Sequence, residues 1–228
     1  MFEALRGLAR RLPDRWQQEV KRHYFARQIR LGAFRTTEPE YDLLEGLVCA
    51  GDWVLDIGAN VGHYTCKLSA LVGSECRVLA FEPIPQTFEL LSANSLLFPF
   101  RNVTLFNTAV SDRPKAAPMV VPPSGNGRPN FYQAQLVDGQ AALTGDHYCV
   151  FACSVDSLDI PHRVSLVKID TEGHELAAIK GMLQLLARDH PVLIVEGEQA
   201  TPFLKALNYV GERIGRSPNT VYHPGGER

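Results

Sequence analysis

Two glycines and two acids at fixed spacing are the first residues whose types point to chemistry. The motif DIGANVGHYT covers residues 56–65, and Glu82 follows 24 positions after Gly58. The apolar run 53–57 predicts a buried strand that Gly58 ends, and a helical pattern opens at Gly62. A second apolar run leads directly to Glu82. Such a unit binds an adenosine-bearing cofactor, because the turn receives one end and the acid accepts hydrogen bonds from the ribose hydroxyls.

The type of cofactor follows from what the glycine loop lacks. A dinucleotide-binding loop has glycine at its second position, so that the backbone can approach a pyrophosphate. Asn60 stands at that position, and Asp56 at the strand end would repel phosphate oxygens. A cofactor without phosphate that carries an ammonium and a sulfonium fits better, which predicts S-adenosylmethionine. The plain alternative is an ordinary strand-to-helix turn with a surface glutamate, and a nicotinamide-dependent reductase is the weakest competitor.

A second group of ionisable residues follows another predicted strand. The mostly apolar residues 164–169 lead to Asp170, Glu172 and His174, and Glu196 ends the next strand. Parallel sheets bind ligands outside the carboxyl ends of their strands, so Asp170 is expected to face the same crevice as the glycine loop. Helix capping by Asp170 and a helix-dipole contact of Glu172 are the structural alternative. That alternative explains one acid, but not a set of acids and a histidine beside a cofactor.

The elements that must position these residues alternate along the chain. Apolar runs of strand length are separated by stretches with helical periodicity, which implies parallel pairing, right-handed crossovers and helices on both faces of a sheet. Thr37 and Glu40 look like a capping box for a helix that ends near Val48. The predicted strands are 53–57, 77–81, 103–107, 164–169, 191–196 and 220–222, and the later predicted helices are 62–72, 85–97 and 172–187.

Residues 1–36 are predicted to be an N-terminal helical extension of the domain formed by residues 37–228. The extension reads as one or two helices interrupted near Pro13, and residues 1–35 hold nine Lys and Arg against three acids. Such charge can attract a membrane surface, nucleic acid or an acidic partner. No nucleic-acid-binding signature accompanies it. We therefore expect a solvated helix face, with an apolar side that packs on the domain: Leu5, Leu8, Leu12 and Trp16.

Residues 113–150 break the alternation of strands and helices. Their first half is rich in Pro and Gly, and short alternating runs then lead to residues 148–153. We expect a loop followed by a hairpin or an edge strand. Long insertions at this edge of a sheet often cover the substrate, so this one is either a substrate lid or a disordered surface loop.

Length and composition limit the remaining options. The chain has 228 residues, of which 45% are hydrophobic and 21% charged, as expected of one α/β domain with a short extension. We see neither a membrane-spanning run nor a signal peptide, which favours the cytoplasm. The five cysteines show no metal-binding spacing, so we expect free thiols in a reducing compartment.

Five blocks of the sequence together resemble the FkbM-type methyltransferases. They are DIGANVGHYT, AFEPIPQTFELLSANS, NVTLFNTAVSD, VKIDTEGHELAAIKG and PVLIVEGE, in the order of that family. The likeness covers about residues 38–112 and 153–222. It implies a class I, Rossmann-like methyltransferase fold with a mostly parallel, seven-stranded, doubly wound sheet. It also implies O-methylation of hydroxyls on sugars, glycans or polyketide-like natural products.

The resemblance assigns roles to particular residues. It implies cofactor contacts in the glycine loop and at Glu82, adenine contacts near Asn107 and Ala109, and active-site roles for Asp170, Glu172 and His174. The full set of predicted cofactor residues is Asp56, Gly58, Ala59, Asn60, Gly62, Glu82, Pro83, Asn107, Ala109 and Asp170. Residues 1–35 and 113–150 match no block, so the resemblance does not identify the acceptor.

The sequence thus predicts an S-adenosylmethionine-dependent O-methyltransferase that acts on a small-molecule or sugar-containing acceptor. An alcohol is a poor nucleophile at neutral pH, so a base must take its proton during attack. We expect His174 in this role, oriented by Asp170 or Glu172, because its ordinary pKa lies nearest neutral pH. No metal ligand is assigned. One alternative is Mg²⁺ held by Asp170 and Glu196, and another is a non-catalytic cofactor-binding module. The oligomeric state stays open, with a homo-oligomer as one option.

Overall fold

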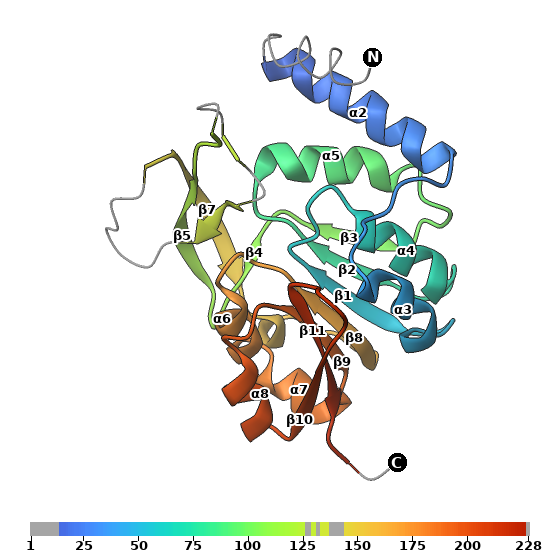
Figure 1. The fold of residues 1–228 in the computed structure, drawn as a ribbon, viewed down its shortest axis with the longest axis vertical. Helices are drawn as coiled ribbons and strands as arrows, with labels where there is room; N and C mark the ends of the chain where they lie inside the picture. Colours follow the sequence, from blue (N-terminus) through green and yellow to red (C-terminus); the bar gives the residue numbers. More distant parts are fainter. Residues whose placement is uncertain (1–13, 126–128, 131–132, 137–143, 227–228) are drawn as a thin grey trace.

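A seven-stranded sheet forms the centre of the computed structural model, which describes residues 14–125, 129–130, 133–136 and 144–226 (Figure 1). The strand order is β10-β11-β9-β8-β1-β2-β3. The strands are β1 (Trp53–Ile57), β2 (Val78–Phe81), β3 (Val103–Phe106), β8 (Val164–Ile169), β9 (Val192–Glu196), β10 (Tyr209–Arg213) and β11 (Asn219–Pro224). Strands β9, β8, β1, β2 and β3 pair in parallel, whereas β11 is antiparallel to both of its neighbours, β9 and β10. The predicted fold class is confirmed.

Helices cover both faces of this sheet, which is why its central strands are apolar almost throughout. One face packs on α3 (Glu40–Leu47), α4 (His63–Val72) and α5 (Pro85–Ser95), and the other packs on α6 (Glu175–Lys180), α7 (Leu183–Asp189) and α8 (Thr201–Ala206). Alternate residues of β1 serve the two sides, since Val54 contacts the α3–α4 side and Leu55 the α7 side. The predicted doubly wound arrangement is confirmed.

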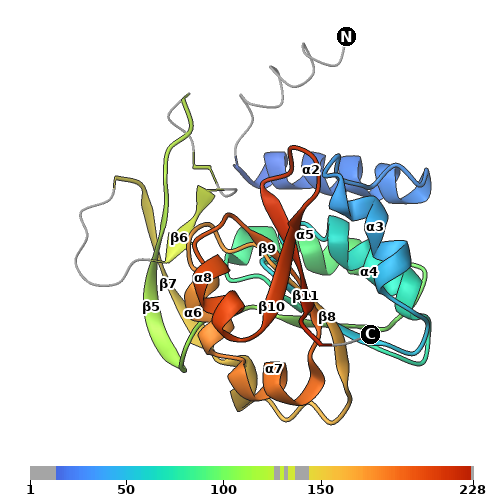
Figure 2. The same ribbon diagram turned by 60° about the horizontal axis from the view of Figure 1, so that its bottom comes forward.

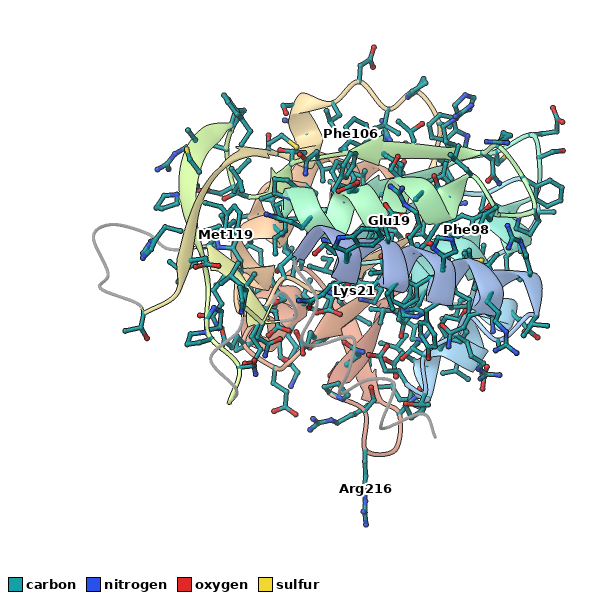
Figure 3. The ribbon with its side chains drawn as sticks, turned by 90° about the horizontal axis from the view of Figure 1, so that it is seen from above. Glu19, Lys21, Phe98, Phe106, Met119 and Arg216 are labelled. Carbon is teal, nitrogen blue, oxygen red and sulfur yellow. The ribbon has the colours of Figure 1, made fainter. Side chains whose placement is uncertain are left out.

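The N-terminal helix α2 (Asp14–Arg30) lies across α5 (Figure 1). Phe25 and Phe34 are buried against Leu90 and Phe98, and Arg22 pairs with Glu89 at 3.2 Å. Glu19 and Lys21 lie on this helix (Figure 3). The prediction that Trp16 packs on the domain is wrong, because Trp16 is 54% exposed and the inner face of α2 begins further along. The predicted contacts of Leu5, Leu8 and Leu12, and the break near Pro13, lie outside the described residues. None of the described helices is long and apolar enough to cross a membrane.

The insertion forms a second, four-stranded sheet beside α6 (Figures 1 and 2). Its strands are β4 (Ala109–Val110), β5 (Lys115–Val121), β6 (Gln135–Leu136) and β7 (Asp146–Cys153), in the order β4-β7-β5-β6. Strands β5 and β7 pair antiparallel, but β5 lies where a loop before the hairpin or edge strand was predicted. The loop predicted at the start of the insertion is partly wrong. Ala117 and Met119 are buried on either side of the exposed Pro118, so this part of the segment alternates as a strand. Pro118 is tolerated there because the described pairing to β6 begins only at Met119.

Two helix predictions need correction. The capping box is wrong, because α3 begins at Glu40 after Pro39 and no side chain caps it. Glu40 is instead fully buried and accepts a hydrogen bond from Tyr64. The single helix predicted over 172–187 is two short helices, α6 and α7. The helical stretch is interrupted at Gly181. A Cβ there would lie 1.9 Å from the carbonyl oxygen of Ser111, the residue that follows β4. Helix α8 and strand β10 were not predicted.

Candidate active site

The predicted functional residues surround one cavity of about 470 Å³ at the carboxyl ends of β1, β2, β8 and β9. That volume lies within the roughly 300–1,000 Å³ typical of small-molecule sites. The predicted residues that line it are Asp56, Gly58, Ala59, Asn60, Glu82, Pro83, Ala109, Asp170 and Glu172. Three others, Gly62, Asn107 and His174, are not among its lining residues. The second sheet also reaches the cavity, through Met119, Ala134 and Leu136.

The loop after β1 depends on backbone conformations that most side chains avoid. Gly58 has φ +80°, and a Cβ there would lie 1.7 Å from the carbonyl oxygen of Asp170. Glycine at this position therefore lets the loops after β1 and β8 pack together. Asn60 has φ +51°, a left-handed conformation that asparagine adopts more readily than most residues. The turn thus brings the backbone N–H of Asn60 to the end of β2.

Glu82 is the acid at the end of β2, and two backbone donors fix its orientation. Its Oε2 accepts from the N–H of Asn60 at 3.0 Å, and its Oε1 accepts from the N–H of Ile84 at 2.9 Å. The residue is 5% exposed. Burial raises its pKa to about 7, although the two N–H donors oppose that shift. Each oxygen keeps a further lone pair, which suits a ligand with two vicinal hydroxyls.

Gly62 and Asn107 support this loop from outside the cavity. A Cβ on Gly62 would lie 2.7 Å from the Leu91 side chain, so this glycine allows α4 to approach α5. Asn107 donates through Nδ2 to the carbonyl oxygens of Glu82 at 2.9 Å and Pro83 at 3.1 Å. It therefore shapes the chain after β2. Its predicted adenine contact stays a prediction, as does the cofactor contact of Gly62.

Asp56 is the acid at the end of β1, and its side chain is fully buried. Its exposure is 0%, and Oδ2 accepts a 2.5 Å hydrogen bond from the Thr65 hydroxyl. Among the described residues, Oδ1 has no hydrogen-bond partner. Burial raises the pKa of Asp56, while the charge of Lys168 opposes the shift. A buried acceptor without a partner is unfavourable, and a ligand that carries N–H donors and positive charge would satisfy it.

Lys168 lies opposite Asp56 in the pairing of β8 with β1, and it is 2% exposed. Its Nζ lies 2.8 Å from Oδ2 of Asp170 and 4.5 Å from the centre of the Tyr64 ring. Burial works against the charge of Lys168, but Asp170 and Asp56 outweigh it and raise the lysine pKa. Burial likewise opposes ionisation of Asp170, yet Lys168 and a hydrogen bond with Glu196 hold the pKa of Asp170 below its ordinary value.

Glu172 and Glu196 complete an acidic group around Asp170. One oxygen from each of the three carboxylates lies within 4.8 Å of the others. Burial, followed by the charge of Asp170, raises the pKa of Glu196 to about 8. Burial and the charges of Asp170 and Glu175 also raise the pKa of Glu172. Glu172 has φ +53°, which is strained for a non-glycine residue, and such strain gathers at functional sites.

His174 turns away from this group. Its Nε2 lies 2.9 Å from the hydroxyl oxygen of Ser111, next to β4. The positive φ values of Glu172 and Gly173 redirect the chain between Asp170 and α6. Glu175 holds this turn in place, since its Oε1 accepts from the backbone N–H groups of Thr171 and Gly173. His174 is therefore not among the residues that line the cavity, and its role as the base stays a prediction.

Glu38, Tyr64 and Lys168 are among the lining residues that were not predicted from the sequence. For Lys168 a signal was present, because a lysine inside the apolar run VSLVKI must find an opposite charge when the strand is buried. For Tyr64 and Glu38 no local signal exists. A tyrosine in a helix and an acid before a proline are common, and only the fold brings them to the β1 and β8 strand ends.

Comparison with known proteins agrees with the geometry. The family described as Methyltransferase FkbM domain matches residues 56–214. These residues include the glycine loop, Glu82 and the acidic group. The fold and the site define a Rossmann-like methyltransferase whose cofactor is S-adenosylmethionine. The chain belongs to the FkbM methyltransferase family.

A curated relative and two solved structures are similar to the chain. Hexuronic acid methyltransferase AglP of Haloferax volcanii is 30% identical over 148 residues, which are 63% of this chain and 55% of AglP. The chain thus spans little more than half the length of that relative. Methyltransferase FkbM from Methylobacillus flagellatus has a TM-score of 0.56 at 17% identity, over 97% of this chain and 58% of the other. A protein described as a putative rRNA-methylase from Clostridium thermocellum has a TM-score of 0.51 at 16% identity, over 82% of this chain and 95% of the other. These two structures show the shared fold.

Proposed function

We propose that the protein transfers a methyl group from S-adenosylmethionine to a hydroxyl of a sugar or a sugar-containing small molecule. The observation that carries this proposal is the acidic group of Asp170, Glu172 and Glu196 beside the cofactor cavity. A hydroxyl must lose its proton on attack, and these carboxylates supply the acceptor for that proton. The similarity to a hexuronic acid methyltransferase supports an acceptor of the sugar class.

Among the three acids, Glu172 is the best candidate for the base. Asp170 is tied to Lys168 at 2.8 Å, and Glu196, with a pKa of about 8, is mostly protonated at neutral pH. Glu172 lines the cavity, and its pKa is raised by burial and by the neighbouring acids, which makes it a stronger base when ionised. The bound cofactor supplies an electrophilic methyl group on a cationic sulfur. Glu172 then takes the hydroxyl proton, while Lys168 keeps Asp170 ionised and in place.

A carboxylate oxygen is the other acceptor that a sugar acid offers. It would need no base, and it would be repelled by the three acids that face it. The two outcomes are separated by assaying neutral sugars and sugar acids with cofactor labelled in its methyl group, then treating the product with mild alkali. An ether on a hydroxyl keeps the label, whereas a methyl ester releases it. Release of the label would overturn the assignment to a hydroxyl.

A metal-assisted version is the second candidate, because the acidic group has the composition of a Mg²⁺ site. The proton held by Glu196 would then be replaced by a divalent ion, which would lower the pKa of the acceptor hydroxyl. Methyl transfer is measured after exhaustive chelation and again after Mg²⁺ is restored. Full activity in the chelated protein supports the base mechanism. Loss that Mg²⁺ reverses would establish the metal-assisted one.

We also propose that the second sheet covers the cavity as a lid. Met119, Ala134 and Leu136 come from this sheet and line the cavity together with Ile84. Apolar side chains at the rim exclude water from the reacting groups, which strengthens the electrostatic interactions within the site. This supports the prediction that residues 113–150 act as a substrate lid. Met119 packs with Ile84 and Ala109, so truncation of Met119 to Ala is expected to raise the Kd for the cofactor as well as the KM for the acceptor.

A further inference from the structure

The segment between α2 and α3 enters the cofactor cavity although it lies outside the residues that match the family. Residues 35–38 line the same cavity as Asp56 and Asp170, and the family match begins only at residue 56. The segment is anchored on both sides. Phe34 is buried against Phe25, and Glu40 accepts a hydrogen bond from Tyr64. Glu38 is therefore placed in the cavity by two fixed neighbours.

The carboxylate of Glu38 has an unused acceptor in this setting. Its Oε2 is buried and has no hydrogen-bond partner among the described residues. The Tyr64 hydroxyl donates to Glu40 at 3.2 Å and lies within hydrogen-bonding reach of the Glu38 carboxylate, while one N–H of the Lys168 ammonium contacts Asp170 at 2.8 Å. Glu38 is close enough to Lys168 and Tyr64 for its charge to act on the pKa of both.

Asp56, which lines the same cavity, has the matching feature. Its Oδ1 is also buried and lacks a partner within the described chain, while its Oδ2 is held by Thr65. Two carboxylates of the cavity lining thus each have one buried oxygen without a partner among the described residues. An ammonium group offers three N–H donors and a positive charge, and it is the group that two such acceptors require. The cofactor carries one ammonium, at its amino acid end.

We propose that Glu38 binds the amino group of the methionine end of S-adenosylmethionine together with Asp56. The inference rests on the use of this cofactor and not on the proposed acceptor. The segment before α3 then forms part of the cofactor site, and it fixes the end of the cofactor that lies away from the adenine. Glu38 holds this end by a charge-assisted hydrogen bond, and the base step proposed for Glu172 does not involve it.

The test compares two ligands that differ only in the amino acid end. S-adenosylhomocysteine carries the ammonium and the carboxylate, whereas 5′-methylthioadenosine keeps the adenosine and the thioether but lacks both. Both are titrated by calorimetry, without acceptor, into the wild type and the Glu38→Gln variant. The variant is expected to bind S-adenosylhomocysteine about ten- to a hundredfold more weakly, as for loss of a charge-assisted hydrogen bond, and methylthioadenosine unchanged.

A matched control is Glu45→Gln, which makes the same chemical change on α3 outside the cavity, where Glu45 pairs with Lys67 at 3.1 Å. It is expected to leave both affinities unchanged. A deaminated analogue of S-adenosylhomocysteine completes the cycle, because its affinity should be the same in the wild type and in Glu38→Gln. This ligand isolates the amino group from the carboxylate.

Three results would overturn the proposal. Equal weakening of both ligands would mean that Glu38 only maintains the fold of the pocket, and thermal unfolding of the ligand-free variant would show that damage. Unchanged affinity for S-adenosylhomocysteine would mean that Glu38 does not touch the cofactor. Unchanged cofactor affinity with a raised KM for the acceptor would place Glu38 in the acceptor site. Failure to methylate any acceptor leaves these titrations unaffected, so the two proposals fail separately.

Discussion

The two halves of the cavity hold their acids by different physical means. In the half formed by β1 and β2, Glu82 accepts from two backbone N–H groups and Asp56 from the hydroxyl of Thr65. In the half formed by β8 and β9, Asp170 faces the buried Lys168 and shares a hydrogen bond with Glu196. Backbone donors cannot move or titrate, whereas a lysine and a group of acids exchange protons. The first half therefore fixes the orientation of its acids, whereas the second half can pass protons between its groups.

The largest effect is expected from a substitution at the contact between the two halves of the cavity. Gly58→Ala places a Cβ 1.7 Å from the carbonyl oxygen of Asp170, at a φ of +80° that alanine avoids. We expect loss of measurable cofactor binding in calorimetry and a lower unfolding temperature. Gly46→Ala on α3 is the control, because nothing lies within 4 Å of its added Cβ. It should be neutral or stabilising. Normal cofactor affinity in Gly58→Ala would show that the close packing is not needed.

Removing the buried cation should destabilise the carboxylates that it neutralises, chiefly Asp170 and also Asp56. Lys168→Met leaves Asp170 beside Glu172 and Glu196 without a compensating charge, and such unpaired buried charges cost about 3–5 kcal/mol. We expect a decrease of this size in the free energy of unfolding, measured by urea denaturation. The double variant with Asp170→Asn should recover part of the loss. An unchanged free energy of unfolding in Lys168→Met would mean that the Lys168–Asp170 pair does not stabilise the folded protein.

Glu172→Gln tests the proton-transfer half without a change in shape. We expect kcat to fall by roughly a hundred- to ten-thousandfold, the usual contribution of a general base, with the affinity for cofactor unchanged. His174→Ala is the companion variant, because His174 contacts Ser111 and does not line the cavity. It should retain most of its turnover. A large loss in His174→Ala with a small one in Glu172→Gln would restore His174 as the base.

The pH dependence of cofactor binding tests the first half. Glu82 has a pKa of about 7, and its ionised form is the better acceptor for ribose hydroxyls. Below that pH the affinity for S-adenosylhomocysteine should fall by up to about tenfold per pH unit. In the ligand-free protein the sign is opposite. The raised pKa means that the folded state holds the proton more tightly, so stability falls as the pH rises from about 4.5 through 7. Glu82→Gln should remove both dependences.

The success of sequence reasoning differed between the halves for a physical reason. Gly58, Asn60 and Glu82 act through the backbone of one strand–turn–helix–strand unit, and its geometry is set by local residue types. The second sheet and the break at Gly181 depend on contacts with distant segments, so the pattern of residues 113–121 was misread as a loop. His174 was expected in the cavity because it lies only four positions after Asp170 in the sequence. The left-handed turn at Glu172 then carried it toward Ser111.

The sequence by itself determined the doubly wound sheet, the glycine loop and the acids at the strand ends, because periodicity and turn chemistry act over neighbouring residues. Only the tertiary structure decided which charges meet. Lys168 lies between Asp56 and Asp170, and Glu38 reaches the same cavity from a segment between two helices. The reason is that electrostatic partners are chosen by distance and burial in space, and neither can be read along a chain.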